Sequence, residues 1–117
     1  MKTSELTGAA LDWAVAKCED ALWDGEGEPA SYQLAYPEYS SWWQHGGPII
    51  ERERIGVWPS DSIENMWAAR PDYEVYPDRL PPSYGPTPLI AAMRCYVASK
   101  LGDTIDIPEE LKQGESK

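Results

Sequence analysis

Hydrophobic residues recur at helical spacing in two long segments, one near each end of the chain. The members of the first apolar stripe are three or four residues apart: Leu11, Ala14, Val15, Cys18 and Leu22. This spacing predicts a helix that begins at Ser4 or Thr7, ends at about Leu22 and buries one face.

The second segment lies near the C-terminus and contains signals for both ends of a helix. Thr87 suits the N-cap because its hydroxyl can accept an amide proton, and Pro88 suits the first helical position. Gly102 suits the left-handed position that follows the last turn of a helix. Between these ends Arg94 is the only charged residue before Lys100, so we expect this helix to be buried on most sides.

Residues 39–54 carry a less regular pattern. Ser40 or Ser41 can cap a helix there, but the sequence Gly46-Gly47-Pro48 opposes a straight helix because Pro48 clashes with the preceding turn. We therefore predict a kinked helix, or a single turn followed by a helix that begins at Pro48.

Short runs of β-formers predict strands in the rest of the chain. Residues 55–58 form one strand, residues 66–70 and 73–76 pair around a turn at Pro71-Asp72, and residues 32–36 form another short strand. Residues 77–86 read as a Pro-rich loop, and residues 112–117 as a frayed tail.

These elements predict one α+β domain over residues 1–117. In this fold the first and last of three helices pack together against a small antiparallel sheet, and the middle helix lies beside them. A chain of 117 residues can bury such a core without metals or disulfides, so we expect Cys18 and Cys95 to be reduced and buried.

Acidic residues outnumber basic ones by 20 to 10, which gives a net charge of −10. Phosphate backbones would be repelled, so nucleic-acid binding through a basic face is disfavoured. A DNA-mimicking inhibitor and a merely solvating acidic surface both fit this charge. No apolar run is long enough to span a membrane and the N-terminus does not resemble a secretory signal, so we expect a cytoplasmic protein.

The chain has six Trp and seven Tyr but no Phe. Aromatic rings with a polar group are common at interfaces and in ligand clefts. We expect Trp42, Trp43 and Trp58 to lie near the surface, because loops or kinks flank them. The corresponding prediction is a homodimer or a higher closed assembly.

Few side chains offer catalytic or metal chemistry. His45 is the single histidine, and the two cysteines lack the spacing of a zinc site, so we expect no metal and no cofactor. Gly46-Gly47-Pro48 is either a phosphate-binding turn or the start or kink of a helix, and the start or kink is favoured. Glu51-Arg52-Glu53-Arg54 reads as a solvated face with local ion pairs rather than as catalytic acids with positioning arginines.

Arg94 needs a partner because it lies in an otherwise apolar helix. Asp12 of the first helix is the expected partner in a buried ion pair, and a small anion held by Arg94 is the alternative. Trp42 and Trp43 offer an aromatic wall for a planar ligand. Residues 42, 43, 46, 47 and 94 are therefore the candidate ligand or partner site.

Three blocks of the chain, in order, support a family resemblance: residues 6–16 (LTGAALDWAVA), residues 46–53 (GGPIIERE), and residues 85–94 (GPTPLIAAMR) followed by KLGD. The chain resembles the NinX family of small phage and prophage proteins. The resemblance implies a phage-encoded protein acting in the cytoplasm of the host bacterium, and it assigns no catalytic residue. The segment from Trp58 to Leu80 departs from the pattern and reads as a variable insert.

The sequence thus favours a non-enzymatic accessory protein that binds a host protein or a copy of itself. The alternative is a protein that binds or sequesters a nucleotide or signal molecule, with Trp42, Trp43 and Arg94 lining one pocket. An enzyme is the least favoured class.

Overall fold

The computed structural model describes residues 2–20, 38–61, 63–71, 82–102 and 104–106. The elements follow one another in the order η1 (Thr3–Glu5), α1 (Gly8–Asp20), α2 (Trp43–Glu53), β1 (Gly56–Pro59), β2 (Trp67–Arg70), β3 (Ser83–Gly85) and α3 (Pro88–Leu101). Three helices and a small antiparallel sheet confirm the predicted α+β class.

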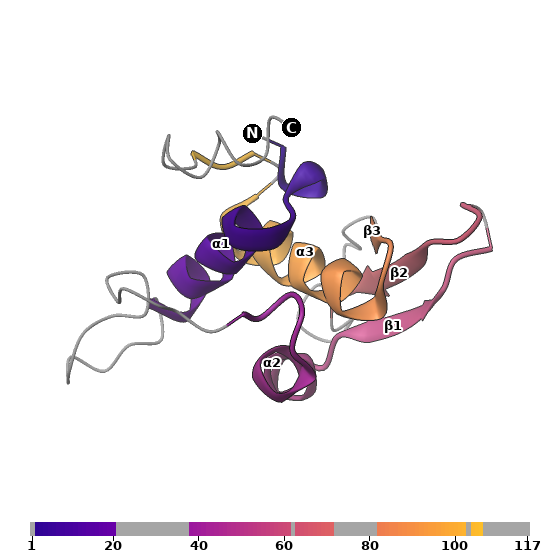
Figure 1. Ribbon diagram of the computed structural model, residues 1–117, viewed down its shortest axis with the longest axis horizontal. Coiled ribbons are helices and arrows are strands. Elements are labelled where there is room, and N and C mark those ends of the chain that lie inside the picture. Colours follow the sequence, from indigo (N-terminus) through magenta and orange to yellow (C-terminus); the bar gives the residue numbers. More distant parts are fainter. Residues whose placement is uncertain (1, 21–37, 62, 72–81, 103, 107–117) are drawn as a thin grey trace.

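Helix α3 lies at the centre of the fold. It contacts α1 and α2 as well as all three strands, and Figure 1 shows it between α1 and the sheet. Eight residues of α3 are buried, including Met93, Tyr96 and the charged Arg94. The expectations that the last helix is buried on most sides and packs with the first are both confirmed.

The ends of α3 form as the sequence predicts. The Thr87 hydroxyl accepts a hydrogen bond from the amide of Ile90 at 3.1 Å, and Pro88 occupies the first turn. At the other end, the Gly102 amide donates to the carbonyl of Ala98, and Gly102 has a φ of +92°. A side chain is strained at that angle, so the chain needs glycine there.

The sheet has the order β1-β2-β3, with both pairs antiparallel. Strands β1 and β2 match two predicted strands closely. The sequence predicts a loop at residues 83–85. This prediction is wrong, because these residues form β3 and pair with Trp67, Ala68 and Ala69 of β2. The expected partner strand 73–76 lies outside the described residues, as do strand 32–36, the predicted helix end at Leu22 and the tail 112–117.

Helix α2 begins earlier than one prediction placed it. It runs through Pro48, so the expected helix start at that residue is wrong. Its last turn closes at Arg54, which has left-handed backbone angles, and the amide of Ile55 reaches back to the carbonyl of Ile50 at 3.0 Å. This C-terminal turn leads directly into β1.

Candidate functional site

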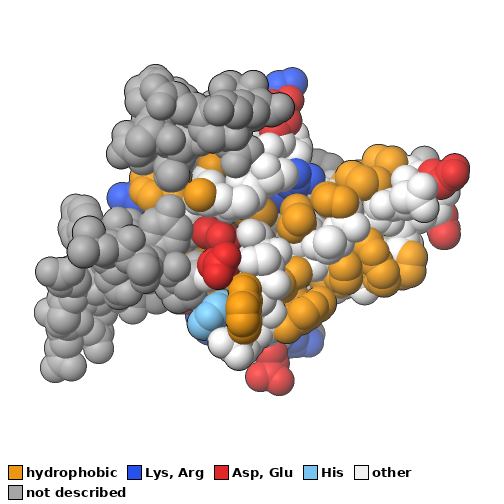
Figure 2. All heavy atoms as spheres, viewed as in Figure 1, with side chains coloured by type: hydrophobic (Ala, Val, Ile, Leu, Met, Phe, Trp, Pro, Cys, Tyr) orange, Lys and Arg blue, Asp and Glu red, His pale blue; other side chains and the backbone are white. Residues whose placement is uncertain are grey.

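Trp42 and Trp43 lie on the surface at the start of α2. Their exposed fractions are 51% and 56%, and that of Trp58 on β1 is 39%. The prediction that these three tryptophans lie near the surface is confirmed. Figure 2 shows orange hydrophobic side chains beside the pale-blue His45 of α2 and along the strands. We call Trp42 and Trp43 together the tryptophan pair.

The turn before the tryptophan pair is fixed to α1 by a buried carboxylate. Asp12 accepts a hydrogen bond from the amide of Ser40 at 2.8 Å, and both residues are buried. The amide of Trp42 donates to the carbonyl of Glu38 at 3.0 Å. Burial raises the pKa of Asp12, while its hydrogen bonds with Ser40 act in the opposite direction. These contacts fix the backbone that leads into the tryptophan pair.

The start of α2 also packs closely on the core through Gly46. A Cβ atom there would meet the carbonyl oxygen of Tyr39 and, at 2.6 Å, the Cδ1 atom of Leu89. The Gly46 amide donates to the carbonyl of Trp42 at 3.0 Å. A phosphate-binding turn needs free amides, so this alternative for Gly46-Gly47-Pro48 is wrong for Gly46. Gly47 lies one residue on, inside the same helix, beside the ring of Trp43.

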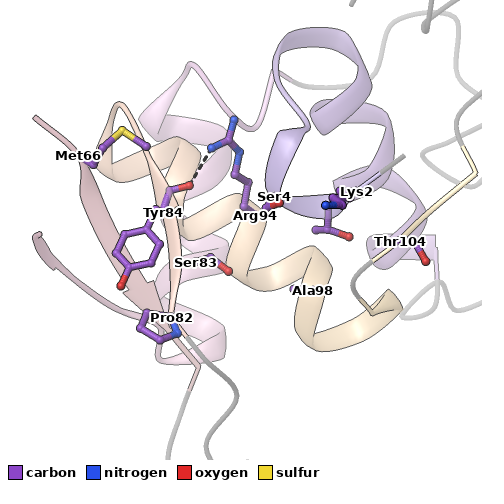
Figure 3. A pocket seen from close by; sticks show the side chains of 10 residues that line it. Lys2, Ser4, Met66, Pro82, Ser83, Tyr84, Arg94, Ala98 and Thr104 are labelled. Atoms are coloured by element: carbon purple, nitrogen blue, oxygen red, sulfur yellow. Dashed lines mark hydrogen bonds between the residues drawn. The ribbon is translucent and has the colours of Figure 1, made fainter. Parts of the chain in front are cut away.

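Arg94 joins α3 to two other parts of the chain. Its Nε donates to the carbonyl of Leu6 at 2.9 Å, and its Nη1 donates to the carbonyl of Tyr84 at 2.8 Å. The first bond reaches the segment between η1 and α1, and the second reaches β3 (Figure 3). The expected ion pair between Arg94 and Asp12 is not formed, since Asp12 binds Ser40 instead.

A cavity of about 450 Å³ lies beside Arg94, between the N-terminal segment and β3. Its described lining residues include Lys2 and Arg94, several hydroxyl side chains and an apolar wall around Met66 and Tyr84 (Figure 3). Neither member of the tryptophan pair lines it. Among the residues that the structure describes, Arg94 lines this cavity and Trp42 and Trp43 do not, so it is not the single pocket that the sequence predicts for all three.

The family model described as "Bacteriophage P22, NinX" matches residues 2–100, which is most of the chain. The chain belongs to the NinX family. No curated protein matches the chain. Membership indicates a phage accessory protein, and the matched range includes both the tryptophan pair and Arg94.

A polar network that sequence reasoning missed joins the three helices of this NinX protein. Arg52 donates to both carboxylate oxygens of Glu19 at 3.2 and 2.8 Å, and to the hydroxyl of Tyr96 at 3.0 Å. Tyr96 in turn donates to Glu19 at 2.6 Å. Burial, followed by the contact with Glu19, raises the pKa of Tyr96.

The sequence predicted only local ion pairs for Glu51-Arg52-Glu53-Arg54, and one of these is present. Arg52 donates to Glu53 at 2.9 Å, and Lys100 lies 3.3 Å from the same carboxylate. Burial alone would raise the pKa of Glu53, but the hydrogen bonds from Arg52 and Lys100 lower it. Contacts between helices cannot be found from helical spacing, so the longer network had no sequence signal.

The two cysteines of the NinX protein lie in the core. Cys18 and Cys95 are free and buried, which confirms the expectation that both side chains lie in the interior. Burial raises the pKa of each thiol to about 12. Within the described ranges, no group of three or more His, Cys, Asp or Glu side chains is placed to hold a metal ion. No helix in those ranges is long and apolar enough to cross a membrane.

Proposed function

We propose that this phage accessory protein works by binding rather than by catalysis, in the cytoplasm of the host bacterium. Its contact surface is the tryptophan pair, and its first partner is a second copy of the chain. The exposure of Trp42 and Trp43, each more than half accessible, is the observation that carries this proposal. Two adjacent exposed tryptophans are typical of surfaces that a protein partner covers.

The charge pattern favours a second copy as the partner. Residues 39–50 contain no Asp, Glu, Lys or Arg, although the whole chain carries a net charge of −10. Two copies that meet through this segment do not bring like charges into direct contact. The remaining repulsion acts over a longer range and is screened by salt.

The geometry around the tryptophan pair further supports a binding role. Asp12 fixes the preceding turn through Ser40, and Gly46 allows α2 to lie close to Leu89. A surface held in place before contact loses less conformational entropy on binding. The backbone that carries the tryptophan pair is therefore preorganised for contact with a partner.

The test is capture of an untagged copy of the chain by a tagged copy in host lysate. We expect the parent to retain the untagged copy and the double variant Trp42→Ser/Trp43→Ser to lose it. The matched control is Ile63→Ser, which removes a hydrophobic side chain of 41% exposure on the loop between β1 and β2. This control is expected to behave as the parent.

Two results would change this conclusion. If the tagged parent retains a host protein but no second copy, self-association is wrong and the host protein is the partner. If the double variant retains the same molecules as the parent, the tryptophan pair is not the contact surface.

A further inference from the structure

The cavity beside Arg94 is built from segments that are far apart in the sequence. Residues 2–4 form one side, Ser83 and Tyr84 of β3 form the opposite side, and Arg94 with Ala98 of α3 lies between them. Figure 3 shows Lys2 and Thr104 together on one side of this space and Tyr84 on the other.

Hydrogen bonds hold both sides of the cavity in place. The Thr3 hydroxyl donates to the carbonyl of Gly102 at 2.6 Å, and Lys2 forms an antiparallel bridge with Thr104. On the far side, Arg94 is bound to the carbonyl of Tyr84. The N-terminal segment and β3 are thus fixed to the same helix, and the cavity has a defined shape between them.

The charge of the cavity differs from that of the whole chain. Lys2 and Arg94 both line it, and none of its described lining residues is Asp or Glu. In a protein of net charge −10, a cavity lined in this way favours an anion over a cation.

The other lining groups point to the rest of the ligand. Hydroxyls of Ser4 and Ser83 can bind sugar or other polar groups, while Met66 and the ring of Tyr84 offer an apolar wall for a flat ring. A volume of about 450 Å³ lies within the range of small-molecule sites. We propose that this cavity binds a small organic anion of the size and chemistry of a nucleoside monophosphate.

This site is distinct from the surface proposed for protein binding. Trp42 and Trp43 do not line the cavity, and residues 2–4 do not belong to α2. Failure of either proposal therefore leaves the other standing.

The experiment is isothermal titration of the purified chain with AMP, adenosine and inorganic phosphate in buffer of low salt. We expect AMP to bind at least about tenfold more tightly than adenosine, because only AMP carries the anionic group. We also expect AMP to bind more tightly than phosphate, because only AMP fills the apolar part. No heat from AMP at millimolar concentration, or equal affinity for adenosine, would overturn the proposal.

Two variants locate the binding site. Lys2→Glu is expected to weaken AMP binding about tenfold or more, whereas Lys17→Glu changes the net charge equally at an exposed position outside the cavity and should alter the affinity less than about twofold. Ala98→Leu fills the cavity without removing a bond of Arg94 and is expected to abolish binding in a folded chain. Equal effects of the two lysine variants, or full AMP binding by Ala98→Leu, would place the ligand elsewhere.

Discussion

At the scale of single residues, Arg94 is a buried cation that links separate parts of the fold. Its exposed fraction is 7%, and it donates to the carbonyls of Leu6 and Tyr84. Hydrogen bonds from a charged donor contribute more than neutral ones, and a buried carbonyl that loses its donor is costly. Arg94 therefore stabilises the contact of α3 with both the N-terminal segment and β3.

Replacing Arg94 tests this assignment. We expect Arg94→Met to lower the free energy of unfolding by about 3 kcal/mol, since it leaves both carbonyls without this donor. Urea denaturation followed by circular dichroism measures the change. An unchanged midpoint would show that neither hydrogen bond contributes to stability.

The raised pKa of Asp12 predicts that the free energy of unfolding depends on pH. Burial raises the pKa of Asp12 in the folded chain, so ionisation costs more in the folded than in the unfolded state. The contribution of Asp12 to the free energy of unfolding is therefore fully present at low pH, where the carboxyl is protonated in both states. It is lost as the pH rises from the ordinary pKa of aspartate, which holds in the unfolded chain, to the raised pKa of the folded chain. Asn cannot ionise but can still accept a hydrogen bond from Ser40.

We therefore expect Asp12→Asn to gain stability relative to the parent as pH rises from about 3 to 7. Asp12→Ala should lose about 1–3 kcal/mol, because the Ser40 amide loses its acceptor. Urea titrations at several pH values measure both effects. A relative stability of Asp12→Asn that falls with rising pH would contradict the assigned burial.

The buried thiols predict low chemical reactivity. Cys18 and Cys95 are 3% and 2% exposed, and burial raises the pKa of each to about 12. Because the thiolate is the reactive form, a disulfide reagent should label the folded chain slowly and the urea-unfolded chain rapidly. Fast labelling of one thiol without denaturant would place that residue at the surface.

At the scale of elements, two neighbouring glycines of α2 have opposite roles. A side chain at Gly46 would collide with Tyr39 and Leu89, whereas a Cβ at Gly47 would lie 3.7 Å from the ring of Trp43 in ordinary contact. Gly46 is needed for close packing. Gly47 only weakens the helix, because glycine has a low helix propensity.

The two alanine variants form a matched pair. We expect Gly46→Ala to lower the free energy of unfolding by about 1–3 kcal/mol through overpacking. Gly47→Ala should raise it by up to about 1 kcal/mol. Thermal melting of both variants beside the parent tests the assignment, which fails if the two substitutions shift the midpoint in the same direction.

The elements also show which features a sequence can predict. Helix α3 was predictable at both ends because Thr87, Pro88 and Gly102 act locally on the backbone. Strand β3 was not, because Ser83-Tyr84-Gly85 has little β preference and forms through pairing with β2. The start of α2 was also left open by the sequence, because tertiary packing at Gly46 and Ile49 overrides the helix-breaking tendency of Pro48.

At the scale of the whole molecule, burial was easier to predict than contact partners. The exposure of Trp42, Trp43 and Trp58 followed from their flanking loops. The partners of Arg94 could not be predicted from the sequence. Helices α1 and α3 each carry one buried charge, Asp12 and Arg94, and the sequence pattern cannot show that these two charges lie in different places. Nor could it show that the fold places Arg94 at a cavity apart from the tryptophan pair.

Light scattering tests most directly whether the tryptophan pair joins two copies. At micromolar concentration we expect the parent to have the mass of a dimer or a higher closed assembly, and we expect moderate salt to preserve or strengthen it by screening the charge of −10 per chain. Trp42→Ser/Trp43→Ser should be a monomer in both conditions. A parent that stays monomeric at low and moderate salt would contradict self-association through the tryptophan pair.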